Sequence, residues 1–396
     1  MAASTPHPEA DTDSVQAGPI SLGIDIGGTK IEGVAIDGDK RLLACHRIPT
    51  RKGNQAVHDD TVTLIRHLLD PVGPNQGPVT VGLGIPGRVD ANRGIVDDAV
   101  NLGIRHMALG PAVAKTTGLP VRVENDVNIA ALGAASQADN TLIAPGTTPH
   151  SEAARDQIRR PASEPGRDGP RALPDQDDHV VAFINLGTGL AAGIIREGRI
   201  EHGASGAIGE IGHISVDAHQ FPCKCGQCGC LETVASGAAV ETLWPGIAHP
   251  LPDLIAQASK GNQHAKEVQD IIGHGIALAV QIVALAIDPA VIILGGGMSK
   301  TGQPLLDLVT EHLNKSAACS HFIASLRLPD RLRLAPADLP IAAIGAALAG
   351  RMAADSRPFE LIGRKSHHDR NHHRQVPGGS RENLCPLHSR PDPAQA

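Results

Sequence analysis

Aromatic residues are nearly absent from this sequence of 396 residues, which contains four Phe, one Trp and no Tyr. Proteins that bind single-stranded nucleic acid or RNA loops stack bases on aromatic rings, and this chain has too few rings for such a platform. A surplus of positive charge is missing too, because 35 basic and 42 acidic residues leave a formal net charge of -7. Such a chain has little to attract a phosphate backbone. We therefore expect no nucleic-acid partner and a core built from Ala, Val, Ile and Leu.

The sequence also lacks the patterns of a targeting segment and of a membrane span. Residues 1–18 are polar and acidic, without the basic start and apolar run of a signal peptide. The longest apolar stretch, 271–294, is interrupted by His274, Gln281 and an Asp-Pro pair, so it falls short of the roughly 18 unbroken apolar residues of a span. We expect a cytoplasmic protein without membrane contact, in which this stretch forms a buried helix and a strand.

The chain is longer than one hydrophobic core usually serves, and we expect two lobes. Three segments are poor in large apolar residues and are predicted to be disordered: 1–18, the Pro-rich 139–178 and the His-rich tail 357–396. Between them, short β-rich runs alternate with helical spacings, which predicts an α/β fold. The predicted strands are 20–26, 33–36, 42–48, 79–85, 121–124, 180–185, 191–196 and 290–294, and the predicted helices are 56–69, 127–136, 236–243, 263–287, 304–314 and 341–353.

Glycine-rich turns follow predicted strands at three places. The first, IDIGGTK, puts Asp25 at a strand end, and the second, NLGTG, repeats its glycine and threonine chemistry. Glycine lets backbone N–H groups approach phosphate oxygens, and a carboxylate can hold Mg²⁺. Singly such turns are often ordinary tight turns, but the pair predicts two loops around a polyphosphate, and the third, GGG, leaves room for a flat ring or ribose. The predicted polyphosphate and Mg²⁺ site consists of Asp25, Gly27, Gly28, Thr29, Lys30, Gly187, Thr188, Gly189, Gly295, Gly296 and Gly297.

Two other nucleotide-binding motifs are excluded. The sequence contains no GxxxxGK[ST], so it has no P-loop. Residues 82–87 match GxGxxG after a strand, but 88–94 are typical of a hairpin turn rather than of the helix that a dinucleotide site requires.

A second group of polar residues surrounds Asp126, which ends a predicted strand and begins a helix. Asp126 can be a helix N-terminal acid that offsets the dipole. Alternatively it is a general base beside a substrate hydroxyl, with Asn125 as its orienting hydrogen-bond partner.

The most specific signal is EIGH followed by CKCGQCGC, which places four cysteines within residues 223–230. In a reducing compartment such a cluster is more typical of metal binding than of disulfides. Three thiolates and the His213 imidazole form a closed tetrahedral site suited to structural Zn²⁺. A closed site has no position for catalytic water, so this metal would fix a loop. Glu210 and Glu232 bracket the loop and are suited to accept hydrogen bonds from sugar hydroxyls.

Over about residues 20–353 the motifs resemble, in order, those of the ROK family of sugar kinases and related repressors: LGIDIGGTK, GIPGRVD, VENDVN, NLGTG, EIGH with CKCGQCGCLE, and ILGGG. The resemblance implies an actin-like, ribonuclease-H-like α/β fold with ATP and Mg²⁺ in a cleft between two lobes. The small lobe would be 19–123, rejoined by a helix at 338–353, and the large lobe 124–337, with a zinc loop at 210–232. A homodimer or homotetramer is expected. The implied base is Asp126, and the implied sugar contacts are Gly87, Asn125, Asp126, Glu210, His213 and Glu232.

Repressors of this family carry a winged helix before the first glycine turn, and the roughly 20 polar residues found there cannot form one. We therefore predict a kinase that converts glucose to glucose 6-phosphate. N-acetylmannosamine or N-acetylglucosamine kinase activity and a non-catalytic sugar sensor are the alternatives. The long insertion 139–178 departs from the family pattern, and so does Cys228. The predicted zinc ligands are His213, Cys223, Cys225 and Cys230, with Cys228 as an alternative ligand.

Overall fold

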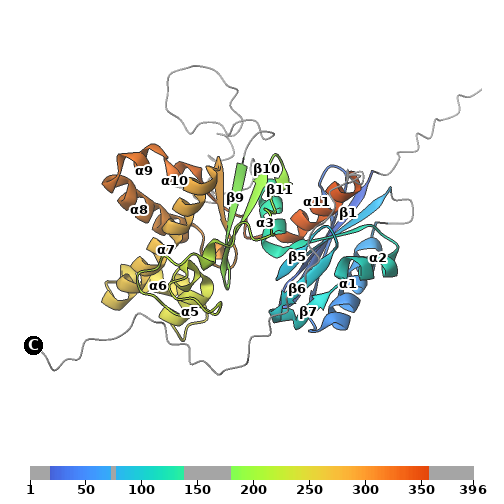
Figure 1. The fold of residues 1–396 in the computed structure, drawn as a ribbon, viewed down its shortest axis with the longest axis horizontal. Helices are drawn as coiled ribbons and strands as arrows, with labels where there is room; N and C mark the ends of the chain where they lie inside the picture. Colours follow the sequence, from blue (N-terminus) through green and yellow to red (C-terminus); the bar gives the residue numbers. More distant parts are fainter. Residues whose placement is uncertain (1–17, 73–76, 138–179, 356–396) are drawn as a thin grey trace, which may run out of the picture.

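The computed structural model describes residues 18–72, 77–137 and 180–355. The insertion 139–178, the tail 357–396 and all but the last residue of 1–18, for which the sequence predicts disorder, lie outside these ranges. The described chain forms two lobes, each built on a five-stranded sheet (Figure 1).

The first lobe carries a sheet of order β3-β2-β1-β4-β8. β1 pairs antiparallel with β2 and parallel with β4, and β4 pairs parallel with β8. A smaller three-stranded antiparallel sheet, β5-β6-β7, follows β4. The elements are β1 (Ile20–Ile26), β2 (Lys30–Ile36), β3 (Leu42–Pro49), α1 (Asn54–Leu69), β4 (Val79–Ile85), β5 (Arg88–Asp90), β6 (Ile95–Ala99), β7 (Ile104–Met107), α2 (Leu109–Thr117) and β8 (Val121–Asn125).

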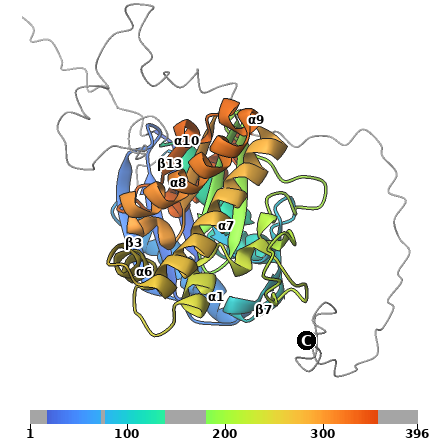
Figure 2. The ribbon, with the colours of Figure 1, turned by 90° about the vertical axis from the view of Figure 1, so that its left-hand side faces the viewer.

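The second lobe repeats this topology in the order β11-β10-β9-β12-β13, with the same parallel and antiparallel pairings. Helices cover the outer face of its sheet, and Figure 2 shows α6, α7 and α8 in front of the strands. Its elements are β9 (Val180–Leu186), β10 (Leu190–Arg196), β11 (Arg199–Ile200), α5 (Gly237–Leu243), α6 (Pro250–Ser259), α7 (Gln263–Ile287), β12 (Val291–Gly295), α8 (Gln303–Cys319), α9 (His321–Ser325), α10 (Leu328–Arg331) and β13 (Leu332–Leu334).

Two helices, α3 (Asp126–Ala135) and α11 (Ile341–Asp355), lie between the sheets. Their apolar residues share one core cluster with Val34 of β2 and Phe183 of β9, which links the lobes. α11 packs closely on β1 and β4 because both strands carry glycine there. A Cβ on Gly23 would lie 1.9 Å from the carbonyl oxygen of Ala343, so any side chain at this position would displace the helix.

Helix α7 is long and apolar enough to cross a membrane by length and composition, yet half of its most apolar window is buried inside the protein. Ile272, Ile276 and Val280 pack in the core of the second lobe, together with strands of its sheet. The helix therefore packs as a core helix, as the interruptions in its sequence predict.

The predicted strands 20–26 and 79–85 and the predicted helix 263–287 have these bounds in the structure. The elements that were not predicted from the sequence are α2, α6, α9, α10, β11, β13 and the three-stranded sheet, of which only the hairpin turn after β5 was predicted. α6 begins at Pro250 and has Pro252 in its first turn, where proline is compatible with a helix although it obscures a helical pattern in the sequence. The strands of the small sheet have three to five residues each, too few for a periodic pattern.

Candidate active site

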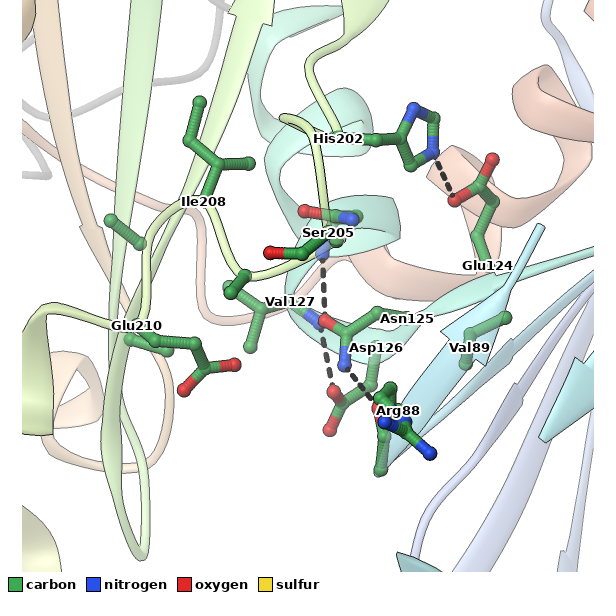
Figure 3. Close-up of a pocket in the computed structure, with 16 residues that line it drawn as sticks. Arg88, Val89, Glu124, Asn125, Asp126, Val127, His202, Ser205, Ile208 and Glu210 are labelled. Carbon is green, nitrogen blue, oxygen red and sulfur yellow. Dashed lines mark hydrogen bonds and ion pairs between the residues drawn. The ribbon is translucent and has the colours of Figure 1, made fainter. Parts of the chain in front are cut away.

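A cavity of about 370 Å³ opens between the two lobes. The first lobe contributes the turn after β4 and the junction of β8 with α3, and the second contributes β10 and residues 202–210. Figure 3 shows Glu210 at one side of the cavity and Arg88 at the other, with Asn125 and Asp126 between them.

Asp126 reaches the cavity because β8 ends at Asn125 and α3 begins immediately after it. The side-chain oxygen of Asn125 caps α3 by accepting a hydrogen bond from the Val127 N–H at 2.9 Å, and its amide donates to the Gly87 carbonyl at 3.2 Å. Burial raises the pKa of Asp126 and the Glu210 carboxylate raises it further, whereas hydrogen bonds from the Val127 N–H and the Asn125 side chain lower it. The structure thus gives Asp126 both features considered from the sequence, the first position of a helix and a place at a cavity.

Asp25 lies at the end of β1, opposite Glu32 of β2 and Gly84 of β4. Burial, followed by the nearby charges of Asp126 and Glu32, raises its pKa to about 7, and Lys30 opposes this shift. A cation bound beside Asp25 would offset the repulsion from these neighbouring carboxylates. Oxygen ligands of this kind fit Mg²⁺, so Asp25 is a suitable residue to hold it.

The raised pKa of Asp25 predicts a pH-dependent stability cost. The folded protein binds the Asp25 proton more tightly than the unfolded chain does. As pH rises from about 4 to 7, the carboxyl group therefore destabilises the folded state increasingly, and above pH 7 the destabilisation reaches its full size. Replacing Asp25 by Asn should remove the cost. A shift of about three units corresponds to roughly 4 kcal/mol, but Asp25 is partly exposed to solvent. We therefore expect a gain on the order of 1–2 kcal/mol at pH 8.

The measurement is urea unfolding of Asp25→Asn and the parent protein from pH 4 to 8, in Mg²⁺-free buffer without a chelator that would remove other metals. The stability gain should shrink toward pH 4. Asp39→Asn, which alters an exposed carboxylate on the same lobe, is the matched control and should show no such trend. A parent-like stability of Asp25→Asn at pH 8 would contradict the prediction.

The first two glycine turns occupy equivalent places in the two lobes, since one joins β1 to β2 and the other β9 to β10. In the second lobe, the Gly187 carbonyl accepts a 2.7 Å hydrogen bond from the N–H of Gly237 at the start of α5. Gly296, with φ of +83°, packs against Leu186. A Cβ on Gly296 would lie 2.6 Å from the carbonyl carbon of Leu186. The turns at 187–189 and 295–297, predicted separately, therefore lie side by side.

The predicted metal ligands also converge. One ligand atom from each of His213, Cys223, Cys225 and Cys230 lies within 4.8 Å of the other three. The Cys225 and Cys230 sulfurs are 3.6 Å apart, and the Cys223 sulfur is 3.9 Å from Nδ1 of His213. A tetrahedron with Zn–S bonds of about 2.3 Å has edges of about 3.8 Å, so the spacing fits Zn²⁺. Cys228, the alternative ligand, is not in this group.

The predicted metal-binding cluster adjoins the predicted sugar-binding carboxylate Glu232, whose Oε1 lies 2.9 Å from the Cys223 sulfur and 3.7 Å from Nδ1 of His213. Gly189 of the second glycine turn is also close, because a Cβ on it would lie 3.2 Å from Oε2 of Glu232. The backbone N–H of Gln227 is the main cause that lowers the pKa of Cys225 to about 6, whereas burial raises the pKa values of Cys223 and Cys230. A thiolate is the form of cysteine that binds metal.

The cavity includes residues that sequence reasoning missed: Arg88, Glu124, His202 and Ser205. Glu124 is fully buried and pairs with both Arg122 and His202. The hydrogen bond to Glu124 raises the pKa of His202, and burial opposes this. A charged residue in an apolar strand directly before Asn125 was a usable signal for Glu124. Nothing in the sequence pairs it with His202, which is 78 positions away.

Comparison with known proteins identifies the family. Residues 21–143 and 173–347 match the model of the ROK family. The chain belongs to the ROK family. This confirms the resemblance inferred from the motifs, and the actin-like α/β fold predicted from it is confirmed as well.

Curated relatives of this ROK protein include kinases of two sugar types. The glucokinase of Halalkalibacterium halodurans is 29% identical over 317 residues, 75% of this chain and 86% of that protein. The N-acetyl-D-glucosamine kinase of Vibrio cholerae is 29% identical over 320 residues, 78% and 92% of the two chains. A ROK family glucokinase from Streptomyces griseus, solved with glucose and AMPPNP, aligns with a TM-score of 0.58 and 25% identity over 84% of this chain and 99% of that one.

Proposed function

We propose that this ROK protein transfers the γ-phosphoryl group of ATP to a hydroxyl of a hexose, with Asp126 as the general base. The observation that carries the proposal is the position of Asp126, on the wall of a cavity between the lobes and opposite Glu210. A sugar sensor without catalysis needs no such carboxylate, and the glucokinase and N-acetyl-D-glucosamine kinase relatives support catalysis.

Phosphoryl transfer requires mainly positioning and neutralisation of charge. In the proposed mechanism the turns at 27–30, 187–189 and 295–297 bind the nucleotide, and Asp25 holds Mg²⁺, which neutralises phosphate charge when bound. Asp126 accepts the hydroxyl proton as the oxygen attacks phosphorus. The raised pKa of Asp126 increases its strength as a base.

Structural Zn²⁺ at the cysteine cluster would orient the sugar-binding residues. The closed set of four protein ligands leaves no open position for substrate. His213 and Glu232 meet at this cluster, so the metal would fix both of them in the loop. We assign these two residues, Glu210 and Asn125 to sugar hydroxyls, with Gly87 held beside them by Asn125.

We propose glucose as the hexose, phosphorylated at its 6-hydroxyl. The S. griseus glucokinase, solved with glucose, supports this choice. The N-acetyl-D-glucosamine kinase of V. cholerae is 29% identical to this chain, as is the glucokinase of H. halodurans, and makes N-acetylglucosamine the second candidate. N-acetylmannosamine is the third.

A coupled kinase assay with a panel of hexoses tests the proposal. Glucose should give the highest kcat/KM, and 2-deoxyglucose should be rejected by up to ~10⁴-fold if buried groups bind the 2-hydroxyl, because they would lose their partner. A higher kcat/KM for either acetamido sugar would overturn the choice of glucose as substrate but leave the assignment of kinase activity intact. If no sugar supported ATP turnover, the proposed kinase activity would be wrong.

A further inference from the structure

A hydrogen bond between the lobes closes one wall of the cavity. Nε2 of His202 lies 2.9 Å from Oε2 of Glu124. Glu124 belongs to β8 of the first lobe, and His202 follows β11 of the second. Both side chains line the cavity, and Figure 3 shows the imidazole of His202 directed toward the Glu124 carboxylate.

Glu124 is a rigid anchor. Its side chain is 1% exposed, and its other oxygen, Oε1, accepts a 2.7 Å hydrogen bond from Nε of Arg122. A buried carboxylate held in this way has little freedom to follow a moving partner, and charge-assisted hydrogen bonds are stronger than neutral ones. The bond therefore fixes His202 rather than Glu124.

The segment that His202 begins, residues 202–208, is here called the cavity loop. Its ends are tied to β10, where the Glu201 N–H donates to the Ile194 carbonyl and the Ala192 N–H donates to the Gly209 carbonyl. Between these ties, residues 203–207 are exposed, and two glycines have positive φ. A loop of this kind is flexible unless a side chain fixes it.

The cavity loop contributes Ser205 and Ile208 to the cavity and leads directly to Glu210. Glu124, in turn, stands two residues before Asp126. The bond between His202 and Glu124 thus joins the loop that leads to the proposed sugar acceptor, Glu210, to the strand that leads to the proposed base, Asp126.

We propose that His202 is a positioning residue for the hexose, because its bond to Glu124 holds the cavity loop against β8 and sets the place of Glu210 relative to Asp126. This inference rests on the proposed hexose kinase function. His202 acts through the loop on the sugar, so its loss raises the KM for the hexose and leaves the KM for ATP and kcat nearly unchanged.

The test compares His202→Leu with His202→Gln, whose side-chain amide can still donate to Glu124. His58→Leu is the matched control, since His58 also pairs with a carboxylate, that of Asp59, but on α1. For His202→Leu we expect a KM for the hexose about tenfold higher, corresponding to about 1.4 kcal/mol, with kcat and the KM for ATP within twofold of the parent. His202→Gln should restore the KM to within threefold.

Hydrogen–deuterium exchange of the ligand-free protein tests the bond independently of activity. Amides of the cavity loop should exchange faster in His202→Leu, and at the parent rate in His202→Gln and His58→Leu. Unchanged exchange of the loop would overturn the inference, and so would faster exchange with an unaltered KM for the hexose. If the parent protein phosphorylates no hexose, the proposed function fails and the role toward sugar fails with it, while the exchange rates still decide whether the bond holds the loop.

Discussion

Replacing Asp126 by Asn should lower kcat for hexose phosphorylation by roughly 10²-fold or more, with little change in the affinity for the sugar. Asn preserves the shape of the side chain and can accept the hydrogen bond from the Val127 N–H that Asp126 accepts at 3.0 Å. It cannot accept a proton as a base does. The loss should therefore appear in the chemical step, and steady-state kinetics together with calorimetric binding of the sugar would separate the two quantities.

Folding and metal content distinguish this effect from structural damage. Asp126 begins α3, and Asn125 caps that helix through its own side chain, so Asp126→Asn should keep the fold and the metal content of the parent. Because burial raises the pKa of Asp126 as it does that of Asp25, the variant should melt at or above the temperature of the parent. Asp90→Asn, at the last residue of β5 and outside the cavity lining, is the control and should keep most of its activity. Near-normal turnover in Asp126→Asn would remove Asp126 from the role of base and leave the proposed mechanism without one.

The parts of the fold that could be predicted are those that local pattern determines. β1 and β4 are nearly continuous apolar runs that end in turn residues, and α7 has an apolar spacing sustained over 25 residues. The glycine turns and the EIGH and cysteine motifs are short as well, so each could be recognised within one stretch of sequence. Their order along the chain then indicated the family.

The cavity wall could not be predicted in the same way, because its residues meet only through the tertiary fold. Arg88 stands at the start of a three-residue strand, and His202 lies in a glycine-containing loop that has no periodicity. Their proximity to Asp126 follows from the repeated topology of the two sheets and from the packing of α3 and α11 between them. The resemblance implied the proposed sugar-binding residues but not the bond between Glu124 and His202.

Removing one metal ligand should affect metal content, stability and sugar binding together. Elemental analysis should find one zinc per chain in the parent protein and close to none in Cys230→Ser. Cys230 is fully buried, and a serine hydroxyl is a poor ligand for Zn²⁺ beside the two remaining thiolates. Metal binding contributes directly to folding, so the melting temperature should fall by roughly 5 °C or more. The KM for the hexose should rise, because His213 and Glu232 lose their fixed loop.

Cys319→Ser is the matched control, since Cys319 is a free, exposed cysteine at the end of α8, outside the predicted metal-binding cluster. It should keep zinc, melting temperature and KM at the parent values. Cys225→Ser removes a second ligand at an exposed position of the cluster, where the substitution disturbs packing less. Loss of metal from this variant would therefore reflect the missing ligand rather than an altered buried side chain. If the zinc-free protein kept full stability and the parent KM, the cluster would not fix the loop, and the sugar-binding assignment of His213 and Glu232 would lose its structural basis.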